Sequence, residues 1–136
     1  METRISSLMT VPVMTVRADD TMAAVADVLQ RNGLSFVPVL EGVRGPLLGI
    51  ISASDILHFQ AAGRELKAVQ AWQVCAYKPL AVQDDTPAID VARLMMERQV
   101  HHVVVMKNQE LAGVVSSLDF VRQYIAQVEA RQAEPR

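Results

Sequence analysis

The chain has 136 residues, of which 13 are Lys or Arg and 15 are Asp or Glu, so its formal net charge is −2. This balance supplies no broad positive field for a polyphosphate backbone, and we expect no nucleic-acid partner. The residues are 51% hydrophobic but only 4% aromatic, which predicts a core of aliphatic side chains in packed β/α layers. The length predicts one compact body.

The first residues and the cysteine count bear on the cellular compartment. Met1-Glu2-Thr3-Arg4 lacks the basic flank and apolar stretch of a signal peptide, and the apolar run 103–106 is far too short to span a membrane. We therefore expect a cytoplasmic protein that does not enter membranes. The single cysteine, Cys75, cannot form an intramolecular disulfide, which agrees with a reducing compartment. We expect it to be a small buried hydrophobe.

The chain contains an internal repeat. Val-Arg-Ala-Asp-Asp-Thr at residues 16–21 is matched by Val-Gln-Asp-Asp-Thr-Pro at residues 82–87, 66 positions later. Apolar residues at helical spacing follow with the same shift, which predicts two equivalent helices. These residues are Met22, Val25, Ala26 and Leu29 in the first copy and Ala88, Val91, Ala92 and Met95 in the second. We expect Asp20 to cap the first helix, Thr86 to cap the second, with Pro87 at its first position, and Gly33 to end the first.

Each helix is followed by two β-rich runs joined by a turn, which predicts a hairpin in each copy. The four runs cover residues 36–40, 47–51, 102–106 and 111–115. Ser-x-x-Asp and a further helix follow each hairpin, and the last helix continues to Val128 before we expect it to fray. Each copy is therefore β-α-β-β-α, and the fold class is α/β (α+β), with two repeats packed face to face. We divide the chain into a first repeat at 1–62, a connection at 63–73, a second repeat at 74–128 and a tail at 129–136.

The order of these motifs resembles the tandem CBS domain (cystathionine β-synthase domain) family, whose pairs are called Bateman modules. No single motif is specific, whereas their order and duplication are, and the resemblance covers nearly the whole chain. It rests on Leu8-Met9-Thr10, Val37-Pro38-Val39, Gly49 to Asp55, Val103-Val104-Val105 and Gly113 to Asp119. The resemblance implies a disc with pseudo-twofold symmetry and two clefts between the repeats, homodimers joined head to head or head to tail, and binding of AMP, ADP, ATP or S-adenosylmethionine as a regulatory ligand.

The two Ser-x-x-Asp turns are the candidate ligand contacts. The hydroxyl of Ser52 or Ser116 at a helix N-terminus can join the unpaired backbone N–H groups in binding phosphate. Asp55 or Asp119, three residues on, is an acceptor that suits the two hydroxyl donors of a ribose. The competing interpretation is a capping box, in which the acid accepts from the serine N–H. Occurrence at equivalent positions of both repeats favours the ligand interpretation.

Two adjacent histidines, His101 and His102, open the first hairpin strand of the second repeat. By resemblance, many nucleotide-binding relatives carry a basic residue there that touches phosphate. Neighbouring side chains on a strand point to opposite faces, so we place only His101 in a pocket. The alternative is a polar strand end that faces solvent. Adjacent strand histidines do not converge on one ion, and we predict no metal site.

The resemblance implies two pockets, each formed from both repeats. The first comprises Thr10, Leu34, Ser35, His101, Val114, Ser116 and Asp119. The second comprises Ile50, Ser52, Ser54, Asp55, Ala76, Val100 and His101. Cys75-Ala76 stands where the family pattern has Met-Thr, which removes a polar side chain, and positive charge for phosphate is sparse. We therefore expect unequal pockets and affinity in the micromolar range, about −8 kcal/mol.

Two other functions compete with nucleotide binding. One is an interaction module that binds no ligand and dimerises or docks through surfaces such as the stripe 121–128 or Trp72. The other is catalysis, but the sequence has no Gly-x-Ser-x-Gly elbow, metal motif or Walker loop, so we predict no catalytic residues and no enzyme. A regulatory module of this kind acts on an unidentified regulated protein or through the geometry of a homodimer.

Overall fold

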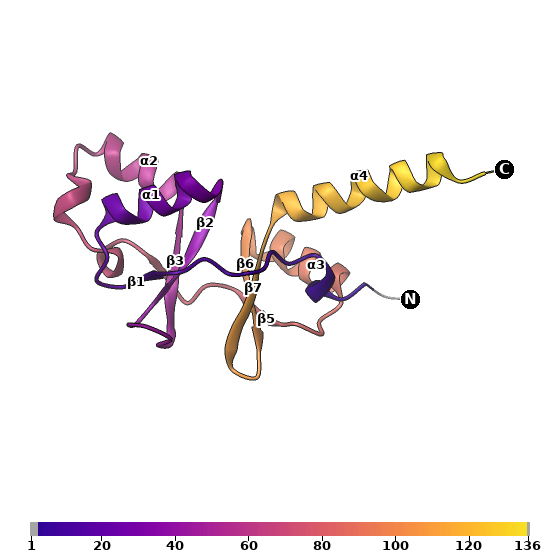
Figure 1. Ribbon diagram of the computed structural model, residues 1–136, viewed down its shortest axis with the longest axis horizontal. Coiled ribbons are helices and arrows are strands. Elements are labelled where there is room, and N and C mark those ends of the chain that lie inside the picture. Colours follow the sequence, from indigo (N-terminus) through magenta and orange to yellow (C-terminus); the bar gives the residue numbers. More distant parts are fainter. Residues whose placement is uncertain (1–2, 136) are drawn as a thin grey trace. The chain divides into compact units, whose positions relative to one another are not determined.

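The computed structural model describes residues 3–135, which pack as two units (Figure 1). The first unit is Met14–Pro79, and the second combines the chain up to Val13 with the chain from Leu80 onward. Each unit contains its own sheet and one β-α-β-β-α repeat. The predicted repeat architecture is therefore confirmed.

The first unit has a four-stranded sheet in the order β1-β2-β3-β4, in which β1 and β2 are parallel and the other pairs are antiparallel. Its helices and strands are β1 (Val16–Arg17), α1 (Met22–Asn32), β2 (Phe36–Leu40), β3 (Leu47–Ser52), α2 (Ala53–Ala61), the 3-10 turns η2 (Leu66–Ala68) and η3 (Ala71–Gln73), and β4 (Ala76–Tyr77). The predicted hairpin strands are confirmed to within one residue.

The second unit has a three-stranded sheet in the order β5-β6-β7, again with one parallel and one antiparallel pair. Its elements are the 3-10 turn η1 (Ile5–Ser7), β5 (Ala81–Gln83), α3 (Ala88–Arg98), β6 (His102–Lys107), β7 (Glu110–Ser116) and α4 (Ser117–Ala133). The last helix thus runs five residues beyond Val128, where the apolar stripe ends. No helix within residues 3–135 is long and apolar enough to cross a bilayer.

Each sheet is extended by residues from the start of the other sequence repeat. Ala76 pairs with Ile50 of β3, and Thr10 bridges to Val114 of β7, with Thr10 N–H donating to the Val114 carbonyl at 2.8 Å. These segments are equivalent, since Ala76 follows Thr10 by the 66-residue shift of the repeat. The boundaries of the two packed units therefore differ from those of the two sequence repeats. The reason is that each edge segment pairs with the strand that satisfies its backbone hydrogen-bonding groups.

Two glycines allow these edge segments to lie close to the sheets. A Cβ at Gly49 would overlap the backbone carbonyl of Ala76, and a Cβ at Gly113 would overlap the side chain of Met9. Both glycines belong to the Gly-hydrophobic-hydrophobic-Ser motif. The motif needs glycine for close approach of a neighbouring chain segment, and both positions are buried.

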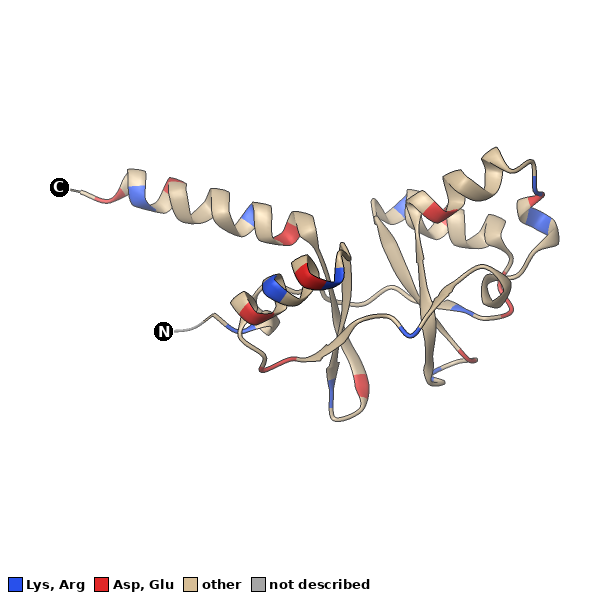
Figure 2. Cartoon of the chain, turned by 180° about the vertical axis from the view of Figure 1, so that it is seen from behind, with Lys and Arg blue, Asp and Glu red and all other residues tan. Residues whose placement is uncertain are grey.

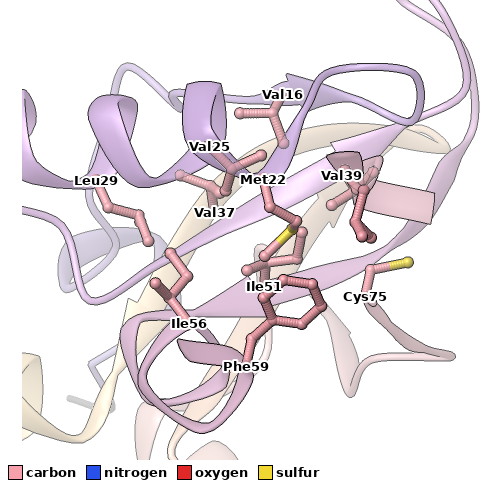
Figure 3. Packing of buried hydrophobic residues seen from close by; sticks show 12 residues of the cluster. Val16, Met22, Val25, Leu29, Val37, Val39, Ile51, Ile56, Phe59 and Cys75 are labelled. Carbon is pink, nitrogen blue, oxygen red and sulfur yellow. The ribbon is translucent and has the colours of Figure 1, made fainter. Parts of the chain in front are cut away.

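Each unit has its own aliphatic core. In the first unit, side chains of the helices and the sheet converge, and Met22, Ile51 and Phe59 point toward one another (Figure 3). The full cluster is Val16, Met22, Val25, Leu29, Val37, Val39, Ile51, Ile56, Phe59, Val69, Ala71 and Cys75. In the second unit it is Ile5, Val82, Ala88, Val91, Met95, Val103, Val105 and Val115. Cys75 is buried, as predicted, with 5% of its surface exposed.

The starts of α1 and α3 differ from the sequence prediction. Thr21 caps α1 by accepting from Ala24 N–H at 3.1 Å, and Asp20 was wrongly predicted as the cap. Asp20 Oδ2 instead accepts from Arg17 N–H at 2.8 Å and closes the turn before the helix. For α3 the cap position is Pro87 rather than Thr86, and no side chain caps it. Pro87 is not the first helical residue, because its ψ of 135° is extended. Gly33 ends α1 at a φ of 60°, as predicted.

Candidate functional site

The start of α2 is a capping box. Ser52 is extended, with φ −103° and ψ 163°, and its Oγ accepts from Asp55 N–H at 3.1 Å. In return Ser52 N–H donates to Asp55 Oδ2 at 2.8 Å. Among the described residues no donor reaches the second oxygen of this carboxylate, Oδ1. The turn therefore presents one unused acceptor oxygen beside the positive end of the helix dipole.

The start of α4 has the same turn with an added arginine. Ser116 N–H donates to Asp119 Oδ2 at 2.7 Å, and Ser116 Oγ lies 3.3 Å from the same oxygen. Arg122 Nη1 donates to Asp119 Oδ1 at 3.0 Å. The Asp119 side chain is only 12% exposed, whereas that of Arg122 is 70% exposed. Both carboxylate oxygens of Asp119 thus have partners within the unit.

These contacts bear directly on the two interpretations of Ser-x-x-Asp. The capping interpretation is correct at both helices, because each acid accepts from the backbone of its own serine. Capping engages Oδ2 alone, so it leaves ligand binding through Oδ1 open at Asp55. Arg122 was missed in the sequence analysis. Its spacing of three residues from Asp119 on a helix was the signal that could have found it.

The residue before each first hairpin strand lies against the start of the following helix. Ser35 accepts through its carbonyl from Ala53 N–H at 2.9 Å, and His101 accepts in the same way from Ser117 N–H at 3.0 Å. His101 Nδ1 also lies 3.3 Å from Ser117 Oγ. His101 is exposed and lies in the same unit as Asp119.

Each unit brings together the predicted residues around its own Ser-x-x-Asp turn. The second unit contains Thr10, Val100, His101, Val114, Ser116 and Asp119. The first unit contains Leu34, Ser35, Ile50, Ser52, Ser54, Asp55 and Ala76. The contribution of Leu34 and Ser35 to a pocket with Asp119, and of Val100 and His101 to a pocket with Asp55, stays a prediction.

A cavity of about 390 Å³ adjoins His101, Val100 and Ser117. Its other walls are Gln99, apolar side chains of α3 and Phe120 of α4, and neither Ser116 nor Asp119 lines it. It is therefore a groove between two helices and not one of the pockets predicted from the sequence. The described residues also contain no group of three or more His, Cys, Asp or Glu side chains arranged to hold a metal ion.

Comparison with known families agrees with the duplicated architecture. The model of the CBS domain matches residues 5–62 and again residues 71–126. The chain belongs to the CBS domain family. Its two matches make it a tandem CBS pair, and the fold has the two α/β repeats of such pairs.

Similar proteins extend this finding. MJ0188 of Methanocaldococcus jannaschii is 29% identical over 136 residues, and the match covers 98% of this chain but only 49% of that protein. The CBS domain pair of MJ0100, solved with 5′-methylthioadenosine and S-adenosyl-L-methionine, superimposes with a TM-score of 0.84 at 20% identity, covering 93% of this chain and 99% of that one. A hexameric CBS-CP12 protein from bloom-forming cyanobacteria superimposes with a TM-score of 0.83 at 23% identity, covering 90% and 72%. At these identities the two structures share the fold with this CBS pair.

Proposed function

We propose that this CBS pair is a regulatory module that binds an adenosine-containing nucleotide and has no catalytic activity of its own. The observation that carries the proposal is the start of α2. There Asp55 holds the cap through Oδ2, which accepts from Ser52 N–H at 2.8 Å, while no described residue donates to its Oδ1. An acceptor-only oxygen suits a ribose hydroxyl, and the adjoining helix N-terminus suits a phosphate or another anionic group.

The likeness to other CBS pairs supports the ligand class. The MJ0100 pair was solved with two adenosine compounds, 5′-methylthioadenosine and S-adenosyl-L-methionine. AMP, ADP, ATP and S-adenosylmethionine all present the same ribose and base. The proposed pockets are the two residue sets predicted from the sequence, around Asp55 and around Asp119. Binding is signalled through the geometry of a homodimer or to a regulated protein partner.

We also propose that the pocket with Asp55 is the tighter one. A ribose bound to Asp119 has to compete with Arg122 for Oδ1, whereas at Asp55 no described residue competes. The expected affinity stays in the micromolar range, about −8 kcal/mol.

A second candidate function is a module that binds no ligand and only associates with protein. It is favoured by the capping role of both aspartates and by the large apolar side chains exposed on α3 and α4. The two candidates predict different responses to nucleotide.

A thermal melting screen with AMP, ADP, ATP, NAD and S-adenosylmethionine tests the proposal. A ligand at 100 times its Kd stabilises the folded state by about 2.7 kcal/mol. Asp55→Asn keeps an oxygen for the Ser52 cap but puts a donor in place of the free acceptor, so we expect the ligand-induced shift to fall while the unliganded melting temperature changes little. Asp119→Asn is the matching change in the other pocket.

Asp90→Asn is the control, because Asp90 also lies in the first turn of a helix but forms an exposed ion pair with Arg93 at 3.6 Å in place of a cap. Flat melting curves for the whole panel would favour the interaction module. A shift that survives the double change of Asp55 and Asp119 would show that the ribose lies elsewhere.

A further inference from the structure

The two Ser-x-x-Asp turns differ in the basic side chains beside them. At the start of α4, Arg122 Nη1 lies 3.0 Å from Asp119 Oδ1, and the carbonyl of His101 accepts from the first N–H of the helix at 3.0 Å. The equivalent residues of the first repeat are His58 and Ser35. The start of α2 thus has a histidine in place of the arginine and a serine in place of the histidine.

The basic residues on the sheet of the first unit lie far from the start of α2. Ser52 is the last residue of β3, and the β2–β3 turn lies at the other end of this strand of 6 residues, about 17 Å away. Arg44 is in that turn, and Arg17 pairs with the last residue of β2 beside it. Lys78 follows β4, whose pairing with β3 leads away from Ser52. Figure 2 shows charged residues of both signs close to the turn of each hairpin, with the rest of the hairpin strands in tan. The backbones that carry these cations are therefore more than one Debye length, about 8 Å, from Ser52.

The other basic residues of the first unit are placed on helical segments away from this turn or already have a partner. Arg31 Nε lies 2.9 Å from Asp27 Oδ2 within α1. Arg64 follows α2, and its guanidinium lies over the ring of Phe59, 4.6 Å from the centroid. Lys67 belongs to η2, which packs against α1. The charged side chain at the start of α2 is therefore that of its aspartate.

The resulting charge at the start of α2 does not favour an anion. The helix dipole alone places about half a positive charge at an N-terminus and attracts anionic groups. The Asp55 carboxylate, which accepts from Ser52 N–H at 2.8 Å, brings a negative charge to the same place. Within residues 3–135 no Lys or Arg pairs with this carboxylate, whereas Arg122 pairs with Asp119. Phosphate sites in proteins rely on such basic side chains, so a phosphate group is disfavoured beside Asp55.

We propose that the turn with Asp55 selects adenosine compounds whose 5′ substituent carries no phosphate over AMP, ADP and ATP. The preferred substituent is a neutral thioether or a cationic sulfonium group. This selectivity rests on the proposed function, binding of an adenosine compound at this turn, and adds the chemical class of the 5′ group. The ribose hydroxyls donate to Asp55 Oδ1 whatever the 5′ group is, whereas each phosphate adds negative charge beside the carboxylate. Affinity at this turn therefore falls as the number of phosphates rises.

Isothermal titration of the full chain with two matched compounds tests the selectivity. 5′-Methylthioadenosine and AMP share base and ribose and differ in the 5′ group alone. The titrations use Asp119→Asn, which leaves the turn with Asp55 intact, at about pH 8, where histidine is neutral. We expect 5′-methylthioadenosine and S-adenosylmethionine to bind at least about tenfold more tightly than AMP, and ATP to bind more weakly than AMP.

Adding a cation beside the turn tests the cause. Ser35 is exposed, and its carbonyl rather than its side chain accepts from Ala53 N–H at 2.9 Å, so Ser35→Arg preserves this contact. We expect Ser35→Arg to raise the affinity for AMP by about fivefold or more and to leave that for 5′-methylthioadenosine nearly unchanged. The gained affinity should fall as NaCl rises from about 0.05 to 0.5 M. The matched control is Gln60→Arg, which adds the same charge at the exposed far end of α2 and should change neither affinity.

The outcomes separate this proposal from the proposed function. AMP binding as tight as that of 5′-methylthioadenosine would overturn the selectivity and leave adenosine binding standing. The absence of binding by every compound to the wild type would overturn the proposed function and the selectivity with it. Thioether binding that survives a further Asp55→Asn change would place the ligand away from this turn. Equal gains in AMP affinity from Ser35→Arg and Gln60→Arg would show that local charge at the turn is not the cause.

Discussion

The second helix of each repeat begins with the same turn but continues differently. α2 has 9 residues and buries Ile56 and Phe59 in the core of its unit. α4 has 17 residues and buries none, and Gln123 occupies the position equivalent to Phe59. At their starts, Asp55 has one carboxylate oxygen to which no residue within 3–135 donates, whereas both oxygens of Asp119 have partners. In this molecule the sheet and the first helix preserve the repeat, whereas the second helix is where the two copies have diverged.

The edge segments show a second contrast between the repeats. The backbone of Ala76 lies over Gly49, whereas the flexible side chain of Met9 lies over Gly113. The contact in the first unit is therefore rigid and the contact in the second is adjustable.

The largest expected effect comes from substituting these glycines. Gly49→Ala would push a Cβ into the Ala76 carbonyl oxygen within a paired strand, and we expect a loss of about 3 kcal/mol in the free energy of unfolding. Gly113→Ala meets Sδ and Cγ of Met9, which a change of rotamer can move, so we expect a loss of about 1 kcal/mol. Urea unfolding of the two variants measures the difference. Equal losses would contradict the contrast between a backbone and a side-chain contact.

An exchange of side chains at equivalent positions of α2 and α4 tests the unequal pockets. Arg122→His removes the pair with Asp119, and His58→Arg brings an arginine to the equivalent place beside Asp55. Because such a helix pair contributes about 0.3–1 kcal/mol, we expect affinity to rise two- to fivefold in the second repeat and to fall similarly in the first. Isothermal titration at about pH 8, where histidine is neutral, measures both.

The control for this exchange is Arg93→His, which breaks an exposed pair with Asp90 away from either pocket. It should leave nucleotide affinity unchanged. If Arg122→His weakened binding instead, Arg122 would contact the ligand rather than compete with it.

The smallest effect concerns Cys75, which is equivalent to Met9 of the second repeat. Burial raises the pKa of the Cys75 thiol. A raised pKa in the folded state means that stability is complete below the unfolded pKa of about 8.5 and is lost as the pH rises through the folded value. Urea unfolding followed by fluorescence of Trp72, the single tryptophan and a residue of the same unit, should show a loss of stability between pH 7 and about pH 9.5. Cys75→Ala should lack this loss, and an identical pH dependence of the two proteins would contradict it.

Local patterns predicted most of the fold. The apolar periodicity of 22–29 and 88–95 identified α1 and α3, and the β-rich runs identified the four hairpin strands, because each element buries one face against its own repeat. Caps were predicted less well. Asp20 and Thr21 are both able to cap α1, and the choice depended on the turn that Asp20 closes with Arg17.

The candidate site was predicted in part. Its aspartates were identified from the duplicated Ser-x-x-Asp pattern, and the capping box was correctly named as their competing role. The ion pair between Arg122 and Asp119 was missed, although their i, i+3 spacing allows it. The pair is not part of the duplicated pattern, because the residue three positions after Asp55 is His58.

The sequence by itself determined the duplicated β-α-β-β-α order, the CBS family and the residue types at the two helix starts, because these follow from spacing along one chain. Only the tertiary structure decided which carboxylate oxygen remains available. It also decided that the segment around Thr10 extends the sheet of the second repeat and that the segment around Ala76 extends the sheet of the first. Those outcomes depend on which polar groups and side chains meet across the fold, and such contacts between distant residues leave no periodic signal in the sequence.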